Sequence, residues 1–247
     1  IITGHSLSNS TGQSVSMVVV TYNSADTILP CLRSLSRTIR ARDEVIIVDN
    51  ASRDRTVALA SEFISGDKRF TIFSNRTNRG FSSATNTGVK ASKNPFIALL
   101  NPDTIVSAGW LERLLFHFTT ETAAVGPISN YVAGLQKMEL YQPHPLAREM
   151  EIPRIAERFA AWNPGRSVDT RLLIGFCMII RREVLLQTGL LDESLFLGND
   201  DLELSWRLRA NGFSLKIAAD TFIHHIGQKS FATETSSKTD ALVRDSA

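Results

Sequence analysis

Short apolar runs alternate with longer amphipathic segments along the first half of the chain. The run over residues 96–100 is apolar throughout, which is typical of a strand buried on both faces of a sheet. In the segments between the runs, apolar residues recur three and four positions apart, which indicates helices with one buried face. The pattern predicts strands over residues 16–22, 43–49, 70–74 and 96–100, and helices over residues 27–40, 54–63, 82–92 (after a turn over 78–81) and 110–119. This alternation predicts the α/β class, with a mostly parallel central sheet flanked by helices.

The pattern loosens after about residue 124. A short strand is predicted over residues 124–127, and residues 143–157 fit either a helical insertion or a mobile loop. Gly212 stands where a glycine commonly ends a helix. No internal repeat is present, and the length alone suggests one large or two small domains. The later segments predict strands over residues 172–181, 213–217 and 221–225, and helices over residues 182–188 and 201–211.

Composition narrows the class of protein. The chain has 247 residues, 43% of them hydrophobic and 21% charged, which is ordinary for a globular domain with a sizeable core. The net charge of +2 gives no broad basic field, so we expect no nucleic-acid partner. Cys31 and Cys177 are far apart and flanked by apolar residues, which predicts two buried free thiols and favours a reducing compartment.

The ends of the chain and its longest apolar stretch bear on location. The stretch over residues 172–180 is well short of the roughly 20 residues that a membrane-spanning helix needs, so we expect no transmembrane segment. Residues 1–14 and 232–247 are polar and rich in Ser and Thr, which predicts mobile ends. The chain does not begin with Met and shows no secretory signal pattern, in keeping with a domain taken from a longer protein.

Polar side chains follow the first two predicted strands. Because the carboxyl ends of parallel strands meet at one edge of a sheet, we expect these loops to lie together, where α/β sheets bind ligands. Their side chains can hydrogen-bond a nucleotide base and ribose, although Asn, Asp and Ser also favour ordinary turns. Neither a GxGxxG nor a GxxxxGK[ST] pattern occurs, which argues against a Rossmann dinucleotide site and a P-loop. The candidate residues are Thr21, Tyr22 and Asn23 in the first loop, and Asp49, Asn50 and Ser52 in the second.

Two further groups of residues offer a candidate cation site and a candidate general base. Asn101 and Asp103 flank a proline where the fourth strand ends, so their oxygens can face one hard divalent cation, magnesium or manganese; a plain β-turn is the alternative. Asp200 and Asp201 stand at a helix start, which the helix dipole alone would favour. Two adjacent carboxylates also raise the pKa of at least one of them, which suits a general base. His225 lies near a strand end, with Lys229 and Ser230 close by for phosphate.

Taken in order, these segments resemble the family 2 glycosyltransferases of GT-A fold, and most closely the bacterial branch labelled rhamnosyltransferase-like. The resemblance covers about residues 16–231 and is specific only when the motifs are taken together. They are VVVTYN (18–23), IIVDNASRD (46–54), NRGFSSATNTG (78–88), LNPDT (100–104, at the place of the DxD motif), DDLELSWR (200–207) and HIGQKS (225–230).

The resemblance implies an inverting enzyme that moves a sugar from a nucleotide-diphosphate donor to an acceptor hydroxyl in polysaccharide, O-antigen or other glycan assembly. It implies one GT-A domain over residues 15–231, with a nucleotide-binding half (15–105) and an acceptor half (106–231). The acceptor is then a glycan, a lipid-linked saccharide or a protein. A cytoplasmic location is implied, with contact at the inner face of the membrane left open.

Carried over by position, the resemblance also implies residue roles. Asp201 becomes the base, with Asp200 beside it. Asp103 and His225 hold a divalent manganese or magnesium ion. Two departures stand out: Asn101 replaces the first Asp of the DxD motif and is a weaker cation ligand, and Asp200 replaces the usual Glu. The implied nucleotide-sugar contacts are Thr21, Tyr22, Asn23, Asp49, Asn50, Ser52, Arg79, Gly80 and Asn101.

Two other functions fit parts of the pattern. A nucleotidyltransferase would need a basic, Gly-rich loop after the first strand, where this chain has Tyr22, Asn23 and Ser24. A non-catalytic domain that binds a sugar nucleotide or a glycan is the alternative from a different class, and the altered DxD motif is what keeps it open. Release of nucleoside diphosphate from a sugar donor separates the enzyme from the binding domain.

Overall fold

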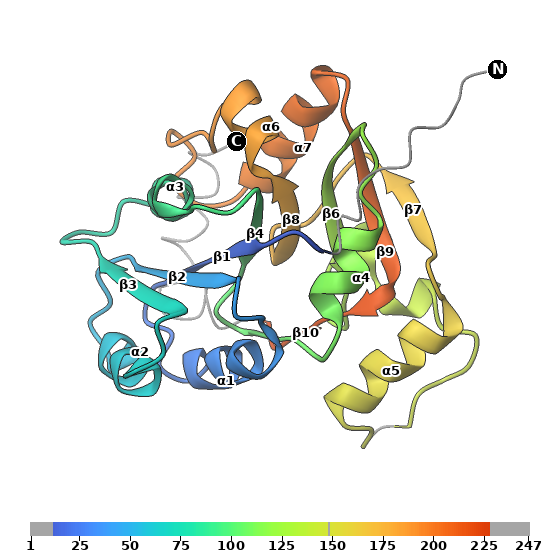
Figure 1. The fold of residues 1–247 in the computed structure, drawn as a ribbon, viewed down its shortest axis with the longest axis horizontal. Coiled ribbons are helices and arrows are strands. Elements are labelled where there is room, and N and C mark those ends of the chain that lie inside the picture. The colour runs from blue at the N-terminus through green and yellow to red at the C-terminus, as the bar shows by residue number, and fades with distance from the viewer. Residues whose placement is uncertain (1–11, 148, 228–247) are drawn as a thin grey trace, which may run out of the picture.

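A computed structural model describes residues 12–147 and 149–227 as one α/β domain built on an eight-stranded sheet (Figure 1). The strand order across the sheet is β3-β2-β1-β4-β8-β6-β9-β7, and a separate two-stranded sheet pairs β10 with β5. The predicted mobile ends, residues 1–14 and 232–247, lie outside the described residues except for residues 12–14. Lys229 and Ser230 also lie outside them. The predicted α/β fold class is confirmed.

The first half of the sheet is parallel, as predicted. β1 pairs in parallel with β2 on one side and with β4 on the other, and β2 pairs in parallel with β3. The register places Thr21 opposite Asp49, so the first two loops leave the sheet side by side. The elements are β1 (Val15–Thr21), α1 (Ile28–Thr38), β2 (Glu44–Asp49), α2 (Thr56–Ile64), β3 (Phe70–Ser74), α3 (Phe81–Ala91), β4 (Phe96–Leu100), β5 (Thr104–Ile105) and α4 (Trp110–Phe116).

The second half of the sheet is mixed. β8 runs antiparallel between β4 and β6, β6 pairs in parallel with β9, and β7 closes the edge antiparallel to β9. Short 3-10 turns cover residues Gly134–Gln136 and Met138–Leu140. The elements are β6 (Thr122–Ile128), α5 (Ile152–Trp162), β7 (Ser167–Thr170), β8 (Cys177–Arg181), α6 (Arg182–Thr188), α7 (Asp200–Ala210), β9 (Ser214–Phe222) and β10 (His224–His225).

Three predictions for this half need correction. The strand predicted over residues 172–181 begins only at Cys177, because residues 172–176 form a loop in which Ile174, Gly175 and Phe176 line a cleft. The strands predicted over 213–217 and 221–225 are one long strand, β9, followed by β10. Of the two alternatives for residues 143–157, the helix holds only for the last part, since α5 begins at Ile152.

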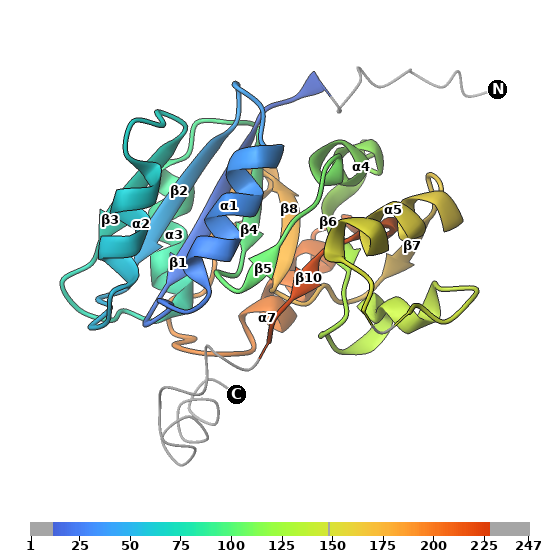
Figure 2. The ribbon, with the colours of Figure 1, turned by 90° about the horizontal axis from the view of Figure 1, so that it is seen from below.

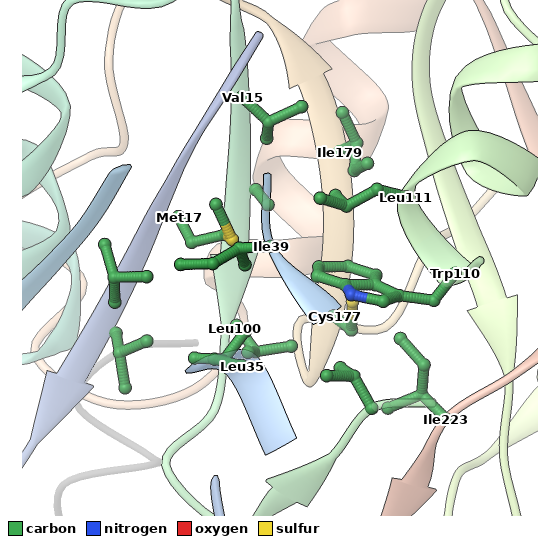
Figure 3. Close-up of a cluster of buried hydrophobic side chains, with 14 of the residues drawn as sticks. Val15, Met17, Leu35, Ile39, Leu100, Trp110, Leu111, Cys177, Ile179 and Ile223 are labelled. Carbon is green, nitrogen blue, oxygen red and sulfur yellow. The ribbon is translucent and has the colours of Figure 1, made fainter. Parts of the chain in front are cut away.

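Apolar side chains pack on both faces of the sheet. Alternate residues of β1 point to opposite faces: Met17 belongs to the cluster packed under α1 and α4, and Val18 to the cluster under α3 and α7. Figure 3 shows the fully buried Trp110 ring within the first cluster. The predicted buried free thiols, Cys31 and Cys177, are both found there, and burial raises the pKa of Cys31 to about 12. None of the described helices is long and apolar enough to cross a bilayer.

Candidate active site

A cleft of about 330 Å³ opens at the carboxyl edge of β1, β2 and β4. In Figure 2, the ends of these strands, β10 and the start of α7 lie along the same lower side of the molecule. The cleft is lined by Val20, Tyr22, Ser24, Asn50, Asn78, Gly80, Phe81, Asn101, Pro102, Ile174, Gly175, Phe176, Phe196, Leu197, Asp200, Asp201 and His225. Segments from both halves of the chain therefore share one cavity.

One wall of the cleft is a closed hydrogen-bond network, which we call the hydrogen-bonded wall (Thr21, Asp49, Asn50, Ser52 and residues 75–80). Asp49 is 3% exposed and accepts from the Thr21 hydroxyl at 3.0 Å (to Oδ1), from the Ser52 N–H at 3.0 Å (to Oδ2), and from the Ser52 hydroxyl. The loop of Asn23 is tied to this network, because its N–H donates to the Ser52 hydroxyl at 2.9 Å. Asp49 and Thr21 thus stand behind the cleft surface, which Tyr22 and Asn50 form.

Asn50 links this wall to the next loop of the chain. Its Nδ2 donates to Asn78 Oδ1 at 2.7 Å and to the Gly80 carbonyl at 3.1 Å, while its Oδ1 accepts from the Arg79 N–H at 3.0 Å. Gly80 has a φ of 82°, and a Cβ there would lie 2.7 Å from the Phe196 carbonyl oxygen, so glycine is required. The Arg79 side chain stays 57% exposed and its guanidinium lies 4.0 Å from Glu193.

The second wall brings the predicted metal residues together. We call it the acidic wall (Asp103, Asp200, Asp201 and His225). β10 pairs antiparallel with β5, which sets His225 opposite Thr104, and the Ile226 N–H donates to the Asp103 carbonyl at 2.9 Å. As a result, His225 Nε2 lies 3.2 Å from Asp103 Oδ1.

These two side chains fit a divalent cation. Asp103 is 2% exposed, and its Oδ1 has no hydrogen-bond partner among the described residues. His225 Nδ1 lies 2.7 Å from the Tyr131 carbonyl, so Nδ1 carries a proton and Nε2 is the ring nitrogen that faces Asp103. Burial alone would lower the pKa of His225, but contact with the Asp103 carboxylate and the Tyr131 carbonyl raises it. In the described ranges no three His, Cys, Asp or Glu side chains converge as a metal site, so a cation here would take its other ligands from a bound molecule.

Asp200 and Asp201 start α7 and face the same cleft. Asp201 Oδ2 accepts from the Gly175 N–H at 3.1 Å, which fixes the direction of that carboxylate. Among residues 12–147 and 149–227, no side chain donates a hydrogen bond to Asp200. Burial, and then the charge of Asp201, raise the pKa of Asp200 to about 6. His225, one of the two candidate cation ligands, therefore lines the same cavity as the carboxylates of Asp200 and Asp201.

The predicted site residues divide into those that line the cleft and those that support it. Tyr22, Asn50, Gly80, Asn101, Asp200, Asp201 and His225 line the cleft; Asp103 contacts His225 behind it; Thr21, Asn23, Asp49 and Ser52 build the wall; Arg79 stands at the rim. Sequence reasoning missed Gly175, Phe176, Phe196 and Leu197, which it treated as strand or loop. It also missed Asn130, whose contact with His225 spans 95 positions along the chain and left no local signal.

The sheet topology, with its cleft at the carboxyl edge, defines the class as the GT-A fold, and solved structures agree on that fold. The crystal structure of GalNAc-T7 with UDP, GalNAc and Mn²⁺ superposes with a TM-score of 0.69 at 16% identity, over 90% of this chain and 46% of that one. The mannosyltransferase PcManGT from Pyrobaculum calidifontis, in complex with GDP-Man and Mn²⁺, gives a TM-score of 0.66 at 18% identity, over 88% and 58%.

The sequence comparisons then fix the family. The model of glycosyl transferase family 2 matches residues 16–189, and the chain belongs to this family. It is 27% identical over 224 residues to the succinoglycan biosynthesis protein ExoO of Rhizobium meliloti, covering 88% of this chain and 62% of that protein. It is 27% identical over 218 residues to the glycosyltransferase AglE of Haloferax volcanii, covering 85% and 66%. The chain thus spans less than two thirds of the length of these relatives. The rhamnosyltransferase-like branch stays a prediction.

Proposed function

We propose that this chain transfers a sugar from a nucleoside-diphosphate donor to an acceptor hydroxyl, with inversion at the anomeric carbon. The observation that carries the proposal is the shared cleft: His225, in contact with Asp103, lines it together with Asp201. Family membership supports the same reaction. The relative ExoO, named for succinoglycan biosynthesis, supports a role in polysaccharide assembly.

The hydrogen-bonded wall would hold the nucleotide. Asp49 accepts one bond at Oδ2, which leaves that carboxylate oxygen a second acceptor position for an N–H of the base. Tyr22, Asn23, Asn50 and Ser52 would complete the base and ribose contacts. The half-exposed Arg79 would reach the diphosphate. These contacts, with Gly80 and Asn101, make residues 15–105 the donor half.

Asp103 and His225 would hold a manganese or magnesium ion. The buried Asp103 Oδ1 and the Nε2 of His225, which face each other at 3.2 Å, support this assignment. Such an ion neutralises the charge that develops on the diphosphate as the sugar leaves. Because Asn101 offers a neutral amide where a carboxylate is usual, we expect the site to depend on nucleotide oxygens for much of its affinity.

Asp201 would take the proton from the acceptor hydroxyl. A hydroxyl is a poor nucleophile until a base accepts its proton. The Gly175 N–H holds the Asp201 carboxylate in the cleft, and Asp200, with its raised pKa, stands beside it. With the base on one side of the sugar and the diphosphate on the other, one in-line displacement inverts the anomeric centre.

The acceptor half, residues 106–231, would bind a glycan, a lipid-linked saccharide or a protein. The two buried free thiols fit a cytoplasmic location. Residues 129–170 lie between the metal and base motifs along the chain, and Tyr131 from this segment contacts the His225 ring. We expect this segment to shape the acceptor side, at the inner face of the membrane if the acceptor is carried on a lipid.

The first test is nucleotide binding with and without metal. Thermal shifts with UDP, GDP and dTDP should be larger when manganese is present, and Asp103→Ala should remove the part that depends on the metal. Asp169→Ala is the matched control, because that carboxylate is 78% exposed on edge strand β7. Equal manganese-dependent shifts in wild type and Asp103→Ala would contradict the metal assignment.

The second test separates an enzyme from a binding domain. Purified protein incubated with a panel of nucleotide sugars should slowly release nucleoside diphosphate from its own donor, and Asp201→Asn should suppress this release while the donor still binds. Binding of a donor without any release, in wild type, would favour a non-catalytic domain.

A further inference from the structure

Side chains continue the pairing between two strands beyond the point where the backbones separate. β6 ends at Ile128, which pairs with Phe222 of β9, and the Ile223 N–H donates to the Ile128 carbonyl at 3.0 Å. The backbone of Ser129 then turns away and bonds to residues 136 and 138. Its hydroxyl remains behind and donates to the Ile223 carbonyl at 2.7 Å.

Asn130 makes the next step of this side-chain ladder. The His225 N–H donates to Asn130 Oδ1 at 2.9 Å, and Asn130 Nδ2 donates to the His225 carbonyl at 3.0 Å. The side-chain amide of Asn130 therefore satisfies both main-chain polar groups of His225, its N–H and its C=O, as a neighbouring strand would. On its other side, β10 pairs with the two-residue strand β5 and with no other strand of the described part of the chain. Such a short ladder offers little to fix the position of His225 on its own.

The residue that follows Asn130 fixes the His225 ring. The Tyr131 carbonyl lies 2.7 Å from His225 Nδ1, and the Phe176 ring stacks on the imidazole with centroids 5.2 Å apart. Adjacent residues of one segment thus hold the backbone and the ring of His225, and together they aim Nε2 at Asp103 Oδ1, 3.2 Å away. Neither Asn130 nor the Tyr131 carbonyl lines the cleft.

We propose that Asn130 is a positioning residue for the metal site, acting through His225 rather than by contact with the ion or the donor. This inference rests on the proposed function, since it concerns the ion that Asp103 and His225 would hold. It also ties the acceptor-side segment that begins at Asn130 to the donor-side ion. A displacement of this segment would move His225 away from Asp103.

Asn130→Asp is the sharpest variant, because it keeps the size of the side chain and the acceptor for the His225 N–H. It replaces the donor with an oxygen that faces the His225 carbonyl oxygen, so the two acceptors repel each other. Asn130→Ala removes both bonds. Asn163→Asp is the matched control, because Asn163 is a buried amide that donates to the Tyr141 carbonyl at 3.1 Å without contact to His225.

Manganese binding is measured by electron paramagnetic resonance and calorimetry in the presence of UDP or GDP, whichever the wild type binds. Loss of a partner that orients a metal ligand typically weakens metal affinity by about 10–100-fold. We expect a loss in this range for both Asn130 variants, with nucleotide binding in the absence of metal unchanged. Asn163→Asp should lower thermal stability and leave manganese affinity as in wild type.

Amide hydrogen exchange gives a readout that does not need the ion. Exchange over residues 222–227 should be faster in Asn130→Ala and unchanged in Asn163→Asp. Wild-type manganese affinity in a folded Asn130→Asp protein would overturn the positioning role and leave the proposed function standing. An equal loss of manganese affinity in Asn163→Asp would overturn it as well, because a general loss of stability would then explain the effect. Wild-type protein that binds no manganese with either nucleotide would contradict both proposals.

Discussion

The two walls of the cleft treat buried carboxylates in opposite ways. In the hydrogen-bonded wall, Asp49 receives three donors from Thr21 and Ser52. In the acidic wall, the buried Asp103 Oδ1 accepts no regular hydrogen bond among the described residues and has the His225 imidazole beside it at 3.2 Å, while Asp200 is held beside Asp201 with its pKa raised to about 6. The first arrangement stabilises the fold, because each buried polar group has its partner. The second costs stability.

This difference shows which polar groups of the cleft are left for a ligand to satisfy. A satisfied network is a rigid platform, and a nucleotide would add bonds to it without reorganising it. An unsatisfied set of groups is suited to binding or transferring something that the folded chain lacks, here a cation at Asp103 and a proton at Asp200 or Asp201. Stability is commonly given up at active sites in this manner. The comparison therefore predicts that removing a carboxylate has opposite effects on the two walls.

The largest effect is expected from Asp201→Ala. Removal of a general base costs about 10²–10⁴-fold in turnover, and the donor should still bind, because the hydrogen-bonded wall is intact. Turnover and donor affinity are measured side by side, with Glu203→Gln on the same helix as the control, since Glu203 pairs with Arg207. If Asp201→Ala keeps near-normal turnover, another residue is the base, and Asp200 would be the first to test.

A smaller effect, on stability, is expected from Asp49→Ala. The substitution leaves the Thr21 hydroxyl and two Ser52 donors without their acceptor, and an unsatisfied buried group costs about 1–3 kcal/mol. Chemical denaturation should show a loss of that size, together with weaker nucleotide binding. Asp49→Asn separates the two roles, because the amide oxygen can still accept the Ser52 N–H while the negative charge is lost. Asp49→Asn with wild-type nucleotide affinity would reduce Asp49 to a structural residue.

The sequence predicts the hydrogen-bonded wall better than the acidic one, for a physical reason. Strands β3 and β4 have the predicted bounds; β4 is a local apolar run closed by polar residues, and β3 is a short Phe- and Ile-rich segment. Since parallel strands end at one edge, the loops after β1 and β2 could be placed together from sequence. The acidic wall depends on long-range pairing: β8 inserts antiparallel beside β4, and β10 returns to pair with β5. No local periodicity encodes either event.

The same limit applies to individual residues of the site. Motifs in the sequence mark Asp103, Asp201 and His225 as site residues. Their positions relative to one another could not be predicted from those motifs. The run over residues 172–176 is apolar enough to predict a strand, but it forms a loop in which Gly175 donates its N–H to Asp201. Half-exposed β7 carries the sequence SVDT, which has too little apolar alternation to predict an edge strand.

The smallest effect, and the one of opposite sign, is expected from Asp200→Asn. The pKa of Asp200 is raised from 3.8 to about 6 in the folded protein, first by burial and then by the charge of Asp201. The folded chain therefore binds a proton between about pH 4 and 6 that the unfolded chain has released, so this group favours folding at low pH and loses that contribution as the pH rises through 6.

At pH 7.5 the buried, ionised carboxylate of Asp200 destabilises the fold, and an amide at this position avoids that cost. One pKa unit corresponds to about 1.36 kcal/mol, and the partial exposure of Asp200 reduces the effect. We therefore expect Asp200→Asn to be more stable than wild type by about 1–2 kcal/mol at pH 7.5. At pH 4 the two proteins should have nearly the same free energy of unfolding. Denaturation at both pH values measures the difference, with Asp169→Asn, an exposed carboxylate, as the control. A loss of stability in Asp200→Asn at pH 7.5 would show that Asp200 has partners like those of Asp49, and the contrast between the two walls would not hold.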